Sequence, residues 1–287
     1  MSRPLNLAAT VMALGLAACG GGDSPSVPAG GPPPPPDAGV PAGWQLVWSD
    51  EFDADGLPDA AKWGYDTERN QAGWYNGELQ YYAAARTENS RVEKGSLFIT
   101  ARKETLSSQP DFGGQAWTSA RMLTRGKAQW TYGFFEVRAK LPCGMGTWPA
   151  IWMLGVGGRW PQDGEIDIME QRGWSAGTVS GTAHTQSYNG GAGPSGSKKV
   201  TDTCDTFHKY QVKWTSDALT WGVDDVTFYT YRKSHNATRS EWPFDDPQYM
   251  LLNVAVGGVL GGAPDDTKFP ARMEVDYVRV YQAPPQP

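Results

Sequence analysis

Short segments with a two-residue apolar alternation constrain the fold of this chain more than any other feature. In FFEVRAKL, residues 134–141, every second side chain is apolar, so the apolar and charged residues would occupy opposite faces of a strand. HKYQVKW, residues 208–214, repeats this pattern, and no convincing long amphipathic helix separates such runs. Further strands are predicted in GSLFITARK, PAIWML, YMLLNVAV and MEVDYVRVYQ. The sequence therefore predicts an all-β fold, an antiparallel β-sandwich.

The N-terminal part has the composition of a leader followed by a tether. Residues 1–18 are interpreted as a signal peptide, because Arg3 precedes a mostly apolar run that is too short for a permanent membrane span. Residues 19–43 are rich in Gly, Pro, Ser and Ala and lack the apolar bulk of a core, which predicts a disordered linker. Residues 44–287 are enough for one large domain.

A cysteine follows directly after the leader. Leu16-Ala17-Ala18-Cys19 resembles the lipobox of bacterial lipoproteins, which implies cleavage before Cys19 and lipidation of that residue. The alternative is an ordinary secretory signal with a chance cysteine. We expect an exported protein whose lipid anchor, its sole membrane contact, lies in the bacterial outer membrane, on the periplasmic or the cell-surface side.

Charge and the remaining cysteines narrow the partners. The net charge is −6 and there are no basic runs, so nucleic acid is not expected as a partner, and we expect a monomer. Cys143 and Cys204 are a candidate disulfide in an oxidising compartment, although the sequence leaves their distance in space open. Two cysteines are too few for a metal cluster.

Three carboxylates in WPQDGEIDIMEQRGW, residues 160–174, break the alternation of a strand. Glu165 and Asp167 would share one face, whereas strict alternation turns Glu170 to the other. A β-bulge at Ile168 or Met169 adds one residue and returns Glu170 to the first face. Three acids this close cannot all ionise freely, so at least one pKa must rise, as a general acid beside a nucleophile requires. A solvated acidic edge or a calcium site are the alternatives.

The same stretch carries a family resemblance. GEIDIMEQRG resembles the ExDxxE signature of glycoside hydrolase family 16 in its bulged, laminarinase-like form. The resemblance implies a β-jelly roll with a concave substrate cleft, and cleavage within a β-glycan with retention of configuration. It implies Glu165 as nucleophile, Glu170 as acid/base, and Asp167 as a hydrogen-bond partner of the nucleophile. Further family markers follow in order over nearly all of residues 44–287: LVWSDEF, NGELQYY, YGFFEVRAKLPCGMGTWPAIWML, LLNVAVGG and FPARMEVDYVRVYQ.

The resemblance also implies substrate contacts. Trp148 and Trp152 match aromatic residues that line the cleft, Asn89 matches a sugar-contacting asparagine, and His184 matches a cleft histidine. The alternatives are packing in the core for the tryptophans, a turn-capping role for Asn89 and a structural role for His184. We expect all four residues to lie in the cleft.

Many relatives carry a calcium ion on the convex side, away from the cleft. The matching ligands are Glu51, the carbonyl of Gly95, and Asp276, and an all-oxygen set suits calcium. The ion would be structural, and no cofactor is expected for catalysis. Cys143 and the pair Gln171-Arg172 depart from the common pattern at positions expected near the cleft, which leaves the linkage preference open.

The leading hypothesis is therefore an endo-β-1,3-glucanase that cuts laminarin-like glucans. Sulfated polymers rank lower, because no basic pocket for sulfate is readable in the sequence. The alternatives are a mixed-linkage β-1,3-1,4-glucanase, another polysaccharidase of the family, or a β-glucan-binding module that does not cut.

Overall fold

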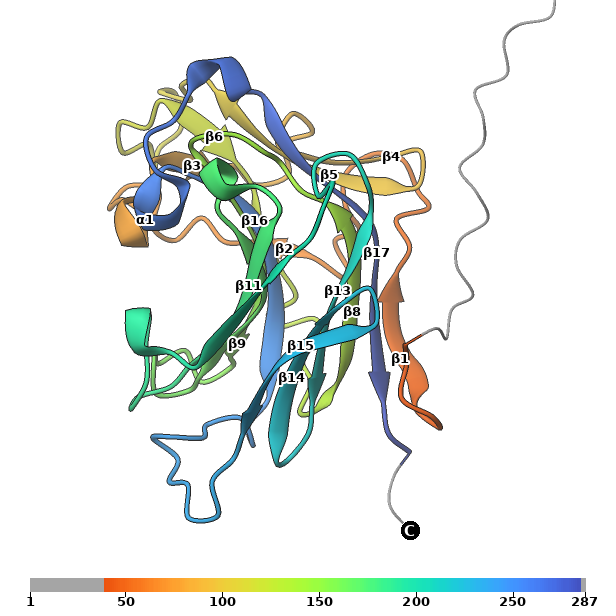
Figure 1. Cartoon of the computed structure of the whole chain (residues 1–287). Coiled ribbons are helices and arrows are strands. Elements are labelled where there is room, and N and C mark those ends of the chain that lie inside the picture. Colours follow the sequence, from red (N-terminus) through yellow and green to blue (C-terminus); the bar gives the residue numbers. More distant parts are fainter. Residues whose placement is uncertain (1–38, 285–287) are drawn as a thin grey trace, which may run out of the picture. The chain divides into compact units, whose positions relative to one another are not determined.

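The computed structural model describes residues 39–284 as one β-rich domain (Figure 1). The predicted signal peptide, Cys19 and most of the predicted linker fall outside these residues. Among residues 39–284, no helix has the length and apolarity needed to cross a membrane.

Two sheets stacked face to face make up the domain, as Figure 1 shows. Neighbouring strands pair antiparallel throughout, except for the short parallel pair β3 and β6. The prediction of an all-β antiparallel sandwich is confirmed. The ten-stranded sheet contains β1 (Gln45–Asp50), β3 (Gln80–Tyr82), β4 (Ser90–Glu93), β5 (Ser96–Lys103), β6 (Trp117–Ser119), β8 (Gly133–Lys140), β13 (His208–Trp214), β14 (Ala218–Val223), β15 (Val226–Arg232) and β17 (Ala271–Gln282).

The seven-stranded sheet carries the acid-rich segment near its middle, in the order β12-β11-β10-β9-β16-β7-β2. Its strands are β2 (Gly64–Tyr65), β7 (Arg121–Leu123), β9 (Thr147–Gly155), β10 (Glu165–Gln171), β11 (Thr178–His184), β12 (Ser195–Lys199) and β16 (Gln248–Val256). Single helical turns occupy the connections: η1 (Tyr75–Gly77), η2 (Gly173–Ser175), η3 (Gly190–Ala192), α1 (Gly258–Gly261) and η4 (Asp266–Lys268).

The strands predicted from clean alternation are observed, with one difference in exposure. FFEVRAKL forms β8 and HKYQVKW forms β13, and the two strands pair along their whole length. Glu136, expected on the solvent face of β8, is only 2% exposed. Its carboxylate accepts hydrogen bonds from Gln211 and from the hydroxyl of Tyr277 on the two neighbouring strands. Alternation thus identified the face correctly, but long polar neighbours cover it.

Large aromatic side chains fill the space between the sheets. Trp63, Trp214, Trp221 and Trp242 are fully buried. The indole N–H groups keep hydrogen-bond partners there: Trp214 donates to the carbonyl of Phe244 at 2.8 Å and Trp221 to the carbonyl of Asp167 at 2.7 Å. Burial therefore leaves neither donor unsatisfied.

Cys143 and Cys204 form a disulfide between the segments that follow β8 and precede β13, with Cα atoms 5.8 Å apart. The bridge spans 61 residues, and the closed loop contains all of β9 to β12. A loop of this length corresponds to about 4 kcal/mol of stabilisation in the chain-entropy description.

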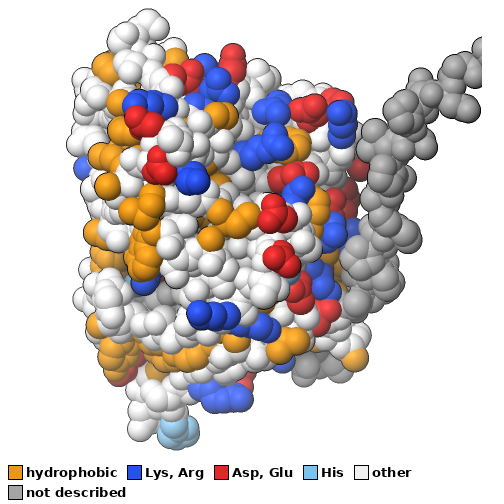
Figure 2. Space-filling model, turned by 45° about the horizontal axis from the view of Figure 1, so that its top comes forward, with side chains coloured by type: hydrophobic (Ala, Val, Ile, Leu, Met, Phe, Trp, Pro, Cys, Tyr) orange, Lys and Arg blue, Asp and Glu red, His pale blue; other side chains and the backbone are white. Residues whose placement is uncertain are grey.

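Opposite charges are mixed on the surface. On the face drawn in Figure 2, Lys and Arg side chains lie among Asp and Glu side chains rather than in one broad basic area. Many charged side chains of residues 39–284 are paired, for example Arg138 with Asp276 and Lys140 with Glu274.

Candidate active site

A β-bulge places the three carboxylates of β10 on one face. Asp167 pairs with Trp152 of β9, and Met169 pairs with the next residue of β9, Ile151, so Ile168 is the extra residue. The register with β11 shifts at the same place. The predicted bulge is confirmed, and Glu170 returns to the face of Asp167 while Ile168 and Met169 are buried in the core.

These carboxylates lie on the wall of a cleft of about 1070 Å³ over the seven-stranded sheet. Residues of strands β7, β9, β10, β11 and β16 line it, and the loops around η1, η3 and α1 contribute its rim. Several of the side chains predicted as functional come together here: Glu165, Asp167, Glu170, Trp148, Trp152 and His184.

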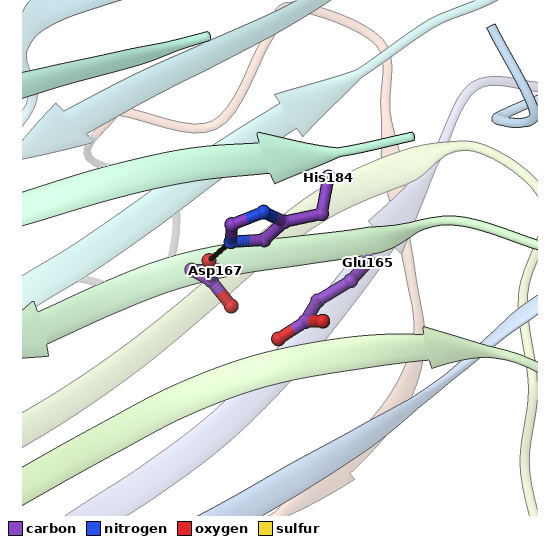
Figure 3. Close-up of side chains that lie close together, drawn as sticks. All are labelled: Glu165, Asp167 and His184. Carbon is purple, nitrogen blue, oxygen red and sulfur yellow. Dashed lines mark ion pairs between the residues drawn. The ribbon is translucent and has the colours of Figure 1, made fainter. Parts of the chain in front are cut away.

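Asp167 is the centre of a small polar cluster (Figure 3). His184 on β11 stands opposite Glu165 in the register, and its Nε2 lies 3.0 Å from Oδ2 of Asp167. Asp167 and Glu165 share a side-chain hydrogen bond. The indole N–H of Trp160, in the loop before β10, donates to the other side of Glu165.

Glu170 has a different partner. The indole Nε1 of Trp148 on β9 donates a hydrogen bond of 3.0 Å to its Oε1. Trp148 is only 7% exposed, so the cleft reaches part of the ring while most of it packs in the sheet. The contact fixes the direction of the Glu170 carboxyl.

Burial and mutual repulsion raise the pKa of all three acids. Burial first, and then the charge of Asp167, raises the pKa of Glu165 to about 8. Burial, followed by the charge of Glu165, raises the pKa of Glu170 to about 7. Burial and the charge of Glu170 raise the pKa of Asp167 well above its ordinary value. At neutral pH the cluster therefore retains protons, and one carboxyl can act as an acid beside an ionised neighbour.

Trp152 lies further along the cleft in a well-defined position. Its indole donates to Oδ1 of Asn253 at 2.7 Å, and the guanidinium of Arg121 lies 4.6 Å from its ring centroid. Arg121 and Asn253 also line the cleft. The sequence did not predict either residue. Strand β7 is too short to show a period, and β16 is apolar at every position except Gln248 and Asn253, so it shows no alternation. Trp160, which lines the cleft and binds Glu165, is likewise not predicted from the sequence.

The structure places Asn89 away from the cleft, contrary to the prediction. It is fully buried, and its amide donates to the carbonyl of Thr100 and the hydroxyl of Thr118, while its oxygen accepts from Arg86. It is absent from the residues that line the cleft. The predicted sugar contact is therefore wrong, because the side chain is fully used in joining β4, β5 and β6.

Two of the three unusual positions also lie away from the cleft. Gln171 is fully buried and accepts hydrogen bonds from Thr203 and from the amide of Gly177, and Cys143 is in the disulfide. Arg172 does line the cleft. Linkage preference can thus depend on Arg172 but not on direct contact with Gln171.

The proposed calcium ligands lie on adjoining segments. Glu51 follows β1, Gly95 is in the turn between β4 and β5, and Asp276 is in β17, which pairs with both β1 and β5. Both carboxylates already have cationic partners: Arg279 binds Glu51 through two hydrogen bonds and Arg138 binds Asp276. In the cleft, ligand atoms of Glu165, Asp167 and His184 also lie within 4.8 Å of one another, but these groups already interact in the acid cluster.

The raised pKa values make the stability of the fold depend on pH. Between pH 4.5 and about 8, a carboxyl whose pKa is raised by folding still holds a proton that the unfolded chain has already released. Stability therefore falls as pH rises through this window. We expect Glu165→Gln to raise the melting temperature by several degrees at pH 8 and to leave it nearly unchanged at pH 4.

The matched control is Glu88→Gln, since Glu88 has an exposed side chain remote in sequence from the cluster. Calorimetry at both pH values is the measurement. An equal change in melting temperature for the two variants at pH 8 would show that the acid cluster does not cause the pH dependence.

Comparison with known proteins agrees with this geometry. The chain is 48% identical over 252 residues to a β-glucanase of Rhodothermus marinus, covering 83% of this chain and 85% of that protein. The crystal structure of SCLam, a non-specific endo-β-1,3(4)-glucanase, superposes with a TM-score of 0.83 at 51% identity, over 85% of this chain and 93% of that one. The laminarinase from Rhodothermus marinus superposes with a TM-score of 0.78 at 48% identity, over 83% and 97%.

The family model described as glycosyl hydrolases family 16 matches residues 78–279, which include every strand from β3 to β16 and most of β17. The chain belongs to glycosyl hydrolase family 16.

Proposed function

We propose that this protein hydrolyses internal β-1,3-glucosidic bonds of laminarin-like glucans with retention of configuration. The observation that carries the proposal is the cluster of Glu165, Asp167 and Glu170 on the wall of an open cleft. An open cleft admits the middle of a polymer, which suits internal cleavage. The activities in the names of the similar proteins support a glucan substrate. SCLam is named a non-specific endo-β-1,3(4)-glucanase, so a mixed-linkage glucan is the second candidate.

The chemistry follows from the roles that the two glutamates take. Glu170, in its protonated form, donates its proton to the glycosidic oxygen while the carboxylate of Glu165 attacks the anomeric carbon and the leaving sugar departs. A water molecule then loses a proton to Glu170 and attacks the same carbon from the opposite side to Glu165. Two inversions release the sugar with its original configuration.

The surrounding groups set the protons for these steps. Glu165 must be ionised to attack, and the indole N–H of Trp160 favours that state because it donates to the carboxylate. Asp167 supports the same state only after it takes up the proton of Glu165. His184 lies beside both Asp167 and Glu165, and its Nε2, 3.0 Å from Oδ2 of Asp167, keeps that carboxyl in place. The raised pKa of Glu170 keeps a proton available for the leaving group near neutral pH.

Two substitutions test the assignment of acid and nucleophile. Glu170→Ala should lose about 10²–10⁴-fold in kcat on laminarin, and far less on an aryl β-glucoside oligomer whose leaving group needs no proton. Glu165→Ala should lose activity on both substrates, because no nucleophile remains. Equal losses on both substrates for Glu170→Ala would contradict its role as the acid.

The same experiments separate hydrolysis from simple binding. Release of reducing ends from laminarin by the wild type is expected of a hydrolase, with Glu165→Gln inactive but still able to bind. A wild type that binds laminarin and releases no reducing ends would instead be a glucan-binding module. Product analysis on laminarin, lichenan and agarose decides between β-1,3, mixed-linkage and galactan substrates.

We also propose a structural calcium ion at Glu51, the carbonyl of Gly95, and Asp276. Oxygen donors from three adjoining segments support it, although Arg279 and Arg138 already neutralise the two carboxylates. If the ion binds, calcium added after chelation should raise the melting temperature by several degrees, and Asp276→Asn should abolish the rise. An unchanged melting temperature would mean that the arginines alone stabilise this corner.

Export and lipid anchoring through Cys19 are a further proposal, supported by Leu16-Ala17-Ala18-Cys19. Expressed in a bacterium, the wild type should sediment with membranes and be released by detergent. Cys19→Ser should appear in the soluble fraction, whereas membrane sedimentation of this variant would exclude the cysteine as the anchor.

A further inference from the structure

Trp221 on β14 forms a contact between the two sheets that the catalytic steps do not use. Its side chain is fully buried, and its Nε1 donates a hydrogen bond of 2.7 Å to the backbone carbonyl of Asp167. Asp167 is the residue after which β10 loses its register with both β9 and β11. The indole of the facing sheet therefore binds the first residue of the bulge.

Gly181 on β11 gives the indole the space to reach this carbonyl. In the register it stands opposite the bulge, between the partner of Asp167 and the partner of Glu170. A Cβ atom at Gly181 would lie 2.2 Å from Cδ1 of Trp221, much closer than two carbon atoms can approach. Any side chain at this position would displace the ring, so Trp221 and Gly181 form one packing unit beneath the bulge.

The bulge creates a need for such a partner. A bulge interrupts the ladder of hydrogen bonds, and a buried carbonyl that loses its partner costs about 1–3 kcal/mol. The indole supplies the donor, and its ring is itself held against Tyr229 of β15, with centroids 5.5 Å apart. A rigid group thus fixes the backbone at the bulge, which lies between Asp167 and Glu170.

We propose that Trp221 is a positioning residue of the acid cluster: it holds the bulge of β10 in the conformation that directs the carboxyl groups of Asp167 and Glu170 into the cleft. It lies in the core on the inner side of β10 and does not line the cleft, so it acts through the strand and not on the substrate. The kinetic consequence rests on the proposed function, whereas the structural consequence does not.

Trp221→Phe tests the proposal, with Trp214→Phe as a matched control. Both tryptophans are fully buried in the ten-stranded sheet, and both donate to a backbone carbonyl, but the partner of Trp214 is Phe244. The two substitutions remove the same atoms and the same kind of hydrogen bond. Well below the melting temperatures, Trp221→Phe should lower kcat on laminarin at least about tenfold with KM within about twofold, and Trp214→Phe should keep kcat within about twofold.

Gly181→Ala is the second variant, because it disturbs the indole while the tryptophan remains. It should reproduce the loss of kcat.

A third readout needs no glucan turnover. If the bulge loosens, the carboxyls separate, and the fall in melting temperature between pH 4 and pH 8 should become smaller in Trp221→Phe but not in Trp214→Phe. Equal kcat and equal pH dependence in the two variants would overturn the proposal. An inactive wild type would refute the proposed hydrolase, and the melting temperatures would still decide the role of Trp221.

Discussion

Repulsion among three carboxyl groups, one buried and two half-buried, is the interaction on which the rest of this site depends. Glu165, Asp167 and Glu170 stand on one strand, and a cation placed directly against each of them would relieve the repulsion. The structure instead supplies uncharged donors: the indoles of Trp160 and Trp148 bind the two glutamates. An indole directs a carboxyl group without neutralising it, so the geometry is fixed while the raised pKa values persist.

The contrast with other carboxylates in the chain shows what this choice does. Asp163, two residues before Glu165, binds the guanidinium groups of Arg159 and Arg239, and these hold its pKa at about 2. That residue can anchor the loop before β10, but it cannot deliver a proton near neutral pH. Partner type, and not burial alone, thus separates an anchoring acid from a reactive one within a few residues.

Much of the fold was readable from the sequence, since alternation in β8 and β13 and the phase of the acids in β10 follow directly from strand geometry. The bulge is the clearest case, because Glu170 has no other way to share a face with Asp167. The failures have a common cause. A period of two reports which face a side chain takes but not what covers that face, so the burial of Glu136 and the internal partners of Asn89 were not predictable. Arg121 lies on a strand of three residues, which is too short for any period.

The disulfide matters for a protein that is exported, as residues 1–18 predict. Cys143 and Cys204 enclose β9, β10, β11 and β12, together with the glycine-rich rim around η3. A protease that cut this rim once would produce two polypeptides still covalently joined, with the acid-bearing strand retained in its sheet. The bridge therefore protects the domain against the loss of its reactive segment through a single nick.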